Sequence, residues 1–287
     1  MNNTARYLVF SKAWLIVSVF LMLTFSSFVN ADHAVEPVSP SIINVCDDMS
    51  EWPPYTYWER VNGKVNKNKL TGAMIDLLDE ISVLTGFKFH VEMRPWKRCL
   101  LEVDKFSTSK RFEMFINGTF NSDRAEKYFL TAPIYFNRPG VWYSKKRFPD
   151  GFTIKTFEQL KNYKLCGVQG YNYERYKILD PNQIDTGATT VDNALRKVEV
   201  GRCDLLLESA AIPYGFQAIG QNFIPEGVAY TPITESPETG FHVFIAKSSP
   251  RAYELLAKIN QAIVILNSEG VIDDIMKSYL PTCGRHC

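Results

Sequence analysis

The pattern that decides the fold lies in FEMFINGTFNSDRAEKY, residues 112–128. The apolar run FEMFI is short enough to be a buried strand, and Asn117-Gly118 ends it. A hydroxyl group follows at Thr119, and Arg124 then appears among residues typical of the first turn of a helix. Arginine usually favours the opposite end of a helix, where the dipole is negative. The stretch therefore predicts a strand-to-helix junction at which an arginine needs its own explanation.

The segments before this junction alternate between strand and helix patterns. SIINVC, residues 41–46, has the β-branched composition of a buried strand, and a long aromatic and charged loop is expected over residues 47–69. Apolar positions on one helical face follow until Gly86, FKFHVEM at 87–93 alternates like a strand, and a proline opens a helix over residues 95–103. Such alternation predicts a mainly parallel sheet with helical crossovers.

The same order of elements resumes in the second half of the chain. We expect helices at TFEQLKNY, GYNYERYKIL and TVDNALRKVEVG, strands at KLCGV and CDLLLE, and two closing helices after HVFIAK. The sequence therefore predicts an α/β fold with two similar lobes, the first of which resumes after the second. The expected boundaries are residues 32–140 and 241–287 for the first lobe and residues 141–240 for the second.

The amino-terminal segment has the features of a secretory signal. Arg6 and Lys12 flank the start of an apolar run that begins at Ala13, and small residues at 29–31 suit a cleavage site. We expect a signal peptide over residues 1–31 and a periplasmic mature protein. An uncleaved membrane anchor remains the alternative, since a spanning helix needs about 20 apolar residues and this run is on the long side.

The charge of the mature chain is close to balanced. Without Arg6 and Lys12, 30 of the 32 basic residues remain against 31 acidic ones. A nucleic-acid partner would require a basic surplus, so this class of partner is not expected. A mature chain of about 255 residues suits two lobes better than one compact core.

The six cysteines all lie in the mature part of the chain, where export favours disulfides. They are Cys46, Cys99, Cys166, Cys203, Cys283 and Cys287. Their pairing is open, and Cys166 and Cys203 are either bridged neighbours or buried thiols. The four histidines do not accompany a cysteine pair as structural zinc would require, so no metal is expected. We expect the terminal CGRHC, residues 283–287, to hold a disulfide or a free tail.

The position of Arg124 suits an anion-binding site. In open parallel sheets, ligands bind beyond the carboxyl ends of strands, near the amino ends of helices. An anion at this junction would meet the guanidinium fork of Arg124, backbone donors and the Thr119 hydroxyl. The alternative is a surface arginine paired with Asp123 or Glu126.

Two long motifs resemble the bacterial extracellular solute-binding proteins of family 3. GAMIDLLDEISVLTGFKFHVEM, residues 72–93, resembles the first helix and second strand of that family, and NGTFNSDRAEKYFLTAPIYF, residues 117–136, resembles its most diagnostic segment. The resemblance covers nearly all of the mature chain. It implies a two-lobed periplasmic binding protein-like II fold, as in the ligand-binding cores of ionotropic glutamate receptors. It also implies that Arg124 grips a ligand carboxylate with help from Thr119.

The resemblance extends to the second lobe. GVQGYNYE, residues 167–174, is similar to a family turn that carries serine or threonine, whereas this chain has Tyr171 and Asn172. LLLESAAIPY, residues 205–214, is similar to a receptor segment whose glutamate binds an α-amino group. It implies that Glu208 is the ammonium partner, with a structural carboxylate as the alternative.

Aromatic residues would complete the site. EWPPYTYW, residues 51–58, occupies the loop in which family members lay a ring against the ligand, which implies Tyr55 and next Trp52. Trp96 matches a second aromatic position. The alternative for each ring is ordinary packing.

The function implied is that of a non-catalytic, monomeric receptor that closes two lobes on a small amino-acid-like or carboxylate ligand. The partners would be the membrane subunits of an ABC-type importer, with no cofactor. The expected hinge consists of the two crossing segments Arg138–Ser144 and Glu238–Phe244. Two alternatives are a cyclohexadienyl dehydratase-like enzyme, with Glu208 as general acid, and a ligand-sensing subunit for a membrane sensor.

Overall fold

The first sheet contains strands from both ends of the chain. The computed structural model describes residues 41–178 and 180–279, so the predicted signal peptide and the terminal CGRHC lie outside the described residues. The strand order of this sheet is β4-β1-β5-β13-β6, and β7 also pairs with β13. The strands are β1 (Ile42–Asp48), β4 (Lys88–Arg94), β5 (Met114–Thr119), β6 (Tyr128–Leu130), β7 (Tyr135–Asn137) and β13 (Thr239–Ala246).

The second sheet is formed by the middle of the chain. Its order is β10-β9-β11-β8-β12, and its strands are β8 (Gly140–Ser144), β9 (Leu165–Val168), β10 (Ile184–Ala188), β11 (Leu205–Leu207) and β12 (Val228–Pro232). The α/β class and the two lobes are therefore as predicted. Each sheet is mixed, because β8 and β13, which receive the chain as it crosses between sheets, run antiparallel to their neighbours, whereas the other strands of each sheet share one direction.

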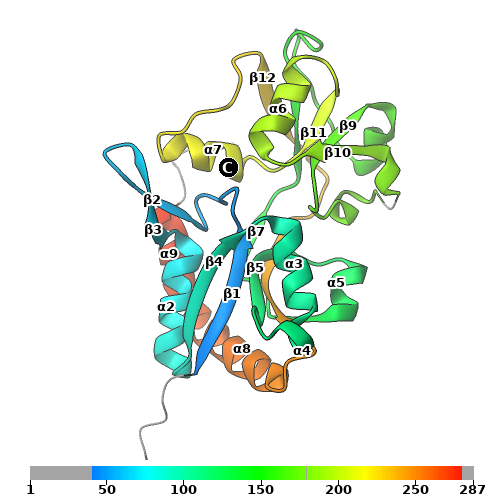
Figure 1. Cartoon of the computed structure of the whole chain (residues 1–287). Helices are drawn as coiled ribbons and strands as arrows, with labels where there is room; N and C mark the ends of the chain where they lie inside the picture. Colours follow the sequence, from blue (N-terminus) through cyan, green and yellow to red (C-terminus); the bar gives the residue numbers. More distant parts are fainter. Residues whose placement is uncertain (1–40, 179, 280–287) are drawn as a thin grey trace, which may run out of the picture. The chain divides into compact units, whose positions relative to one another are not determined.

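The helices cover the sheets as apolar periodicity requires (Figure 1). In the first lobe, α2 (Ala73–Thr85) packs with α8 (Ala252–Ser268) and α9 (Val271–Tyr279), whereas α3 (Trp96–Asp104) packs on β1 and β5. In the second lobe α6 (Val191–Glu199) packs on β8 and β9. The remaining helices are α4 (Phe106–Ser109), α5 (Ser122–Lys127), α7 (Ala211–Ala218) and the short 3-10 helices η1 (Phe157–Asn162), η2 (Glu174–Tyr176) and η3 (Pro181–Gln183).

Two local predictions differ from the structure. The expected loop at 47–69 contains a hairpin of β2 (Tyr57–Val61) and β3 (Lys64–Thr71), joined at Asn62-Gly63, whose φ values of 52° and 74° suit a tight hairpin turn. The helix expected at GYNYERYKIL is only η2. Asn172 Oδ1 accepts the Glu174 amide at its start, and Lys177 ends it with a φ of 58°.

Two disulfides join sequence-distant parts of each lobe. Cys46 at the end of β1 is bonded to Cys99 on α3, and Cys166 on β9 is bonded to Cys203 just before β11. Cys283 and Cys287 lie outside the described residues. The first bridge ties two segments that carry site residues.

The chain crosses between the sheets through two adjacent segments. It leaves the first sheet after Asn137 and returns to it at Thr239, and the crossing segments are joined by a hydrogen bond from Ile233 N to Pro139 O of 3.0 Å. Arg138 and Glu238 also approach across them, with 3.6 Å between Nη2 and Oε1. Each expected hinge segment begins at one of these crossings, at Arg138 or Glu238, and continues into β8 or β13.

Among the residues that the structure describes, none of the helices is by itself both long and apolar enough for a membrane span. The bent pair α8 and α9, which meet at 79°, passes such a test only when taken together.

Candidate functional site

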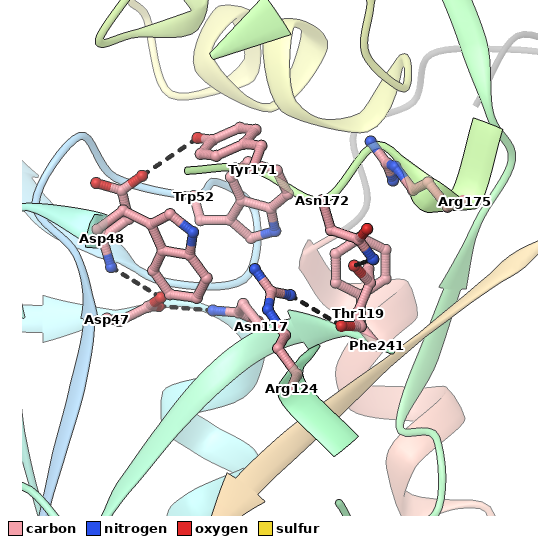
Figure 2. Close-up of a pocket in the computed structure, with 11 residues that line it drawn as sticks. Asp47, Asp48, Trp52, Asn117, Thr119, Arg124, Tyr171, Asn172, Arg175 and Phe241 are labelled. Carbon is pink, nitrogen blue, oxygen red and sulfur yellow. Dashed lines mark hydrogen bonds between the residues drawn. The ribbon is translucent and has the colours of Figure 1, made fainter. Parts of the chain in front are cut away.

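A cavity lies where the carboxyl ends of β1 and β5 face the loop after β9 (Figure 2). Its free space is about 400 Å³, including the part open to solvent. It is lined by Asp47, Asp48, Trp52, Trp96, Asn117, Thr119, Arg124, Tyr171, Asn172, Arg175 and Phe241. Five of the seven predicted site residues therefore meet here, and Tyr55 and Glu208 do not line the cavity.

Arg124 owes its position to the start of α5. The Asn121 side chain caps this helix by accepting the Arg124 amide at 2.8 Å, so the arginine lies in the first turn. Its guanidinium returns toward β5, and Nη1 donates to Thr119 O at 2.8 Å. The rings of Trp96, Phe115 and Phe244 lie 5.5–5.9 Å from the guanidinium carbon.

The Arg124 charge is buried without an acidic partner. The residue is only 6% exposed, and within residues 41–178 and 180–279 no carboxylate lies within ion-pair distance of it. Its Nε and Nη2 make no hydrogen bond to those residues. Burial lowers the pKa of Arg124 to about 10, with a smaller contribution from Arg175, so the side chain stays charged at neutral pH. An anion in the cavity would remove this electrostatic penalty.

Thr119 and Asn172 connect the two lobes at the cavity. Asn172 Nδ2 donates to Thr119 Oγ1 at 2.8 Å and to Phe120 O at 2.6 Å. The Asn172 side-chain amide thus donates a hydrogen bond to the Thr119 hydroxyl, the group that the resemblance assigns to ligand binding. The Thr119 hydroxyl keeps its own proton available for an acceptor in the cavity.

Aromatic side chains form the walls around these polar groups. Trp96 Nε1 donates to Gly170 O at 3.0 Å, which joins α3 to the loop after β9. The Tyr171 ring meets Trp52 edge to face with centroids 5.5 Å apart, and its hydroxyl donates to Asp48 Oδ2 at 3.2 Å. Rings held by hydrogen bonds on both lobes give the cavity a defined width.

Tyr55 is buried and does not line the cavity. Its ring stacks on Tyr135 at 3.8 Å, and its hydroxyl donates to Asn137 at 2.8 Å. Trp52, the second choice in the same loop, lines the cavity instead. The sequence places an aromatic residue in this loop, but it does not say which ring turns outward.

Glu208 forms an internal ion pair with a residue that the sequence did not single out. Its Oε1 accepts the Ser209 amide at 2.7 Å and lies 3.5 Å from Arg175 Nη2. The side chain is 1% exposed, so burial raises the pKa of Glu208 while Arg175 opposes the rise. These contacts fit the alternative role named for Glu208, that of a structural carboxylate, better than that of a ligand ammonium partner.

Five lining residues were not predicted: Asp47, Asp48, Asn117, Arg175 and Phe241. The first two follow the apolar part of β1 directly, and Asn117 lies near the end of β5, two residues before Thr119. Their place at the carboxyl ends of parallel strands was a usable signal. Arg175 and Phe241 carry no such mark in the sequence.

Asp47 is a buried carboxyl group with a perturbed pKa. It accepts hydrogen bonds from the Asp48 amide at 2.8 Å and from Asn117 Nδ2 at 2.6 Å. Desolvation raises its pKa from 3.8 to about 7, with the Asp48 charge adding to the rise and the hydrogen bonds opposing it. Between those two pH values the folded state keeps a proton that the unfolded chain has released.

The free energy of unfolding should therefore fall as pH rises through this window. Asp47→Asn should remove up to about 1.4 kcal/mol of that decline per pH unit. Urea unfolding of both proteins at several pH values between 4 and 7 measures the two slopes. Equal slopes would show that Asp47 ionises alike in the folded and unfolded states.

The described residues contain one cluster with metal-ligand atoms close together, formed by Cys166, Asp185 and Cys203. Both cysteines belong to one disulfide, so their sulfur atoms are not thiolate ligands.

Comparison with known proteins places the chain in a family. Residues 43–282 match the profile of the bacterial extracellular solute-binding proteins, family 3. The chain belongs to this family. A search of curated proteins finds no match.

Solved structures share the fold at low sequence identity. The substrate-binding protein AbpA of an amino acid ABC transporter from Streptococcus pneumoniae, bound to L-arginine, matches at 17% identity and TM-score 0.64, over 83% of this chain and 94% of that one. The arginine-, lysine-, histidine-binding protein ArtJ from Geobacillus stearothermophilus matches at 17% and 0.62, over 85% and 97%. The ancestral amino acid-binding protein AncCDT-1, a precursor of cyclohexadienyl dehydratase, matches at 18% and 0.62, over 84% and 96%.

Proposed function

We propose that this protein is a periplasmic receptor that captures a small amino-acid-like or other carboxylate ligand in the cavity between its lobes. The Arg124 guanidinium binds the carboxylate, and the Thr119 hydroxyl donates a further hydrogen bond. Trp52, Trp96 and Tyr171 enclose the rest of the ligand. The bound ligand is then passed to the membrane subunits of an ABC-type importer by a monomeric, exported protein.

The observation that carries this proposal is the buried charge of Arg124. A guanidinium that is 6% exposed, faces a cavity and lacks an acidic neighbour among the described residues is unfavourable in the empty protein. Binding of an anion turns this penalty into a charge-assisted hydrogen bond, so the anion has a higher affinity for the closed lobes than for the open ones. The family and the amino-acid-binding relatives support an importer as the destination.

A thermal-shift screen tests the proposal. Amino acids, opines and small carboxylic acids are each compared with their methyl esters, which keep the carbon skeleton but lack the negative charge. A true ligand at a hundred times its dissociation constant should add about 2.7 kcal/mol of stability, and its ester should add much less. Equal stabilisation by acid and ester would contradict an anion site at Arg124.

Binding without catalysis is the role that the position of Glu208 supports. The candidate general acid of a dehydratase is ion-paired with Arg175 and lies outside the cavity lining. Purified protein incubated with prephenate or arogenate should give no aromatic product. Turnover of either compound would contradict the proposed receptor function and show that the protein is an enzyme.

Closure of the lobes should depend on a glycine that does not line the cavity. Gly215 on α7 faces the Pro53 backbone of the first lobe, and a Cβ atom there would lie 2.6 Å from the Pro53 carbonyl carbon. Gly215→Ala should weaken ligand binding by about 1–3 kcal/mol. The substitution favours the helix itself, so thermal stability without ligand should not fall.

Gly227→Ala is the matched control, because a Cβ atom there meets nothing within 4 Å. Calorimetric titration of both variants separates the effects. Unchanged affinity in Gly215→Ala would mean that ligand binding does not require α7 to approach Pro53.

A further inference from the structure

A second guanidinium lines the same cavity as Arg124. The Arg175 side chain is 7% exposed, and its only close acidic group among the described residues is Glu208, at 3.5 Å from Nη2. Nε and Nη1 of Arg175 are buried without any hydrogen-bond partner there. In the view of Figure 2, Asn172 lies between the guanidinium groups of Arg124 and Arg175. Donor capacity is therefore unsatisfied on both arginines.

The acidic groups of the cavity are in the opposite condition. Asp47 accepts hydrogen bonds from the Asp48 amide and Asn117, and Asp48 accepts them from the Ser50 amide at 3.0 Å and from Tyr171 at 3.2 Å. Glu208 is engaged through Oε1, by Arg175 and Ser209, whereas its Oε2 is buried without a hydrogen-bond partner among the described residues, and Glu208 does not line the cavity. A ligand ammonium directed toward Glu208 would meet the Arg175 guanidinium first. Among the residues that line the cavity, the buried side-chain atoms without a hydrogen-bond partner are the Arg175 donors, so the lining favours ligand acceptors over ligand donors.

We propose that the ligand is a small diacid, with one carboxylate on Arg124 and the second on the free donors of Arg175. The class includes simple dicarboxylates and acidic amino acids, whose ammonium group would lie nearer to Asp48. The proposal rests on the carboxylate site proposed above and adds a second anionic contact to it. Because Glu208 balances one charge, each arginine contributes to an anion pocket without two uncompensated cations.

The test compares each diacid with its own monoamide, which has the same shape and one negative charge fewer. The probes are succinate against succinamate, glutarate against glutaramate, aspartate against asparagine and glutamate against glutamine. Calorimetric titration of the full mature protein should show at least one diacid bound about tenfold or more tightly than its monoamide. If carboxylates bind but no pair is discriminated, the second anionic contact is refuted while the site at Arg124 stands.

The double variant Arg175→Met/Glu208→Leu locates the second contact. Removal of both charges avoids leaving one buried charge unpaired, as either single variant would. The diacid-to-monoamide affinity ratio should fall toward one in this variant. A ratio in the double variant equal to that of the natural protein overturns the role of Arg175. If the natural protein binds none of the acids, both this inference and the function on which it rests are overturned.

Discussion

Arg124→Met should weaken ligand binding strongly while leaving the empty protein at least as stable as before. The variant loses the group that holds the ligand carboxylate, which would then be desolvated in the cavity without a partner. We expect a loss of roughly 3–5 kcal/mol, which is on the order of a hundredfold or more in affinity. Arg124→Ala should weaken binding to a similar extent.

Arg124→Met should not lower the free energy of unfolding of the ligand-free protein, although it weakens ligand binding. Arg124 is buried beside Trp96, Phe115 and Phe244 without an acidic neighbour in the described chain, and Met fits such surroundings without a charge. Urea unfolding without ligand should therefore give an unchanged or higher free energy of unfolding. A structural arginine would behave differently, since its removal would destabilise the fold.

Two further variants complete this test. Arg124→Lys keeps the charge but loses the planar fork, so we expect an intermediate affinity. Arg98→Met is the control, because Arg98 is 62% exposed and pairs with Glu102 on the surface of α3. Binding by Arg124→Met at the affinity of the natural protein would mean that the carboxylate site lies elsewhere.

Glu208→Ala should destabilise the protein by roughly 3–5 kcal/mol, because Arg175 would remain buried without its countercharge. Restoring the balance by Arg175→Met/Glu208→Leu should recover most of that loss, since an apolar pair of similar volume replaces the ions. Urea unfolding of the single and double variants measures both effects. The comparison assigns to Glu208 a role within the second lobe.

A ligand-binding glutamate would give another pattern. If Glu208 met an α-ammonium group, Glu208→Ala would lower the affinity for amino acids and leave the free energy of unfolding almost unchanged. The double variant would then be no more stable than the single one. Such results would return Glu208 to the cavity and require a different conformation of Arg175.

The sequence allowed the framework to be predicted because the framework depends on local periodicity. The apolar strand FEMFI, the helix that begins near Arg124 and the helix stop at Gly86 each follow from residues close in sequence. Arg124 was found in the same way, since a strand-to-helix junction implies the carboxyl edge of a sheet. The hairpin after β1 was missed although Asn62-Gly63 indicated it.

The remaining part of the site depends on contacts between distant segments. Arg175 and Glu208 lie in different elements of the second lobe, and no local pattern indicates that they pair. Tyr55 and Trp52 belong to one loop, and tertiary packing against Tyr135 decides which ring faces the cavity. The hydrogen-bond partner of Tyr171 is Asp48, on the other lobe. Because this contact joins segments distant in sequence, the width of the cavity could not be predicted from local patterns either.

A crystal structure of the complex with the best acid from the ligand screen would be the most direct test of the central claim. We predict a ligand carboxylate within hydrogen-bond distance of Arg124 Nε and Nη2, with the Thr119 hydroxyl donating to it. A ligand whose carboxylate contacts neither group, or a complex in which Arg124 points into solvent, would contradict the assignment.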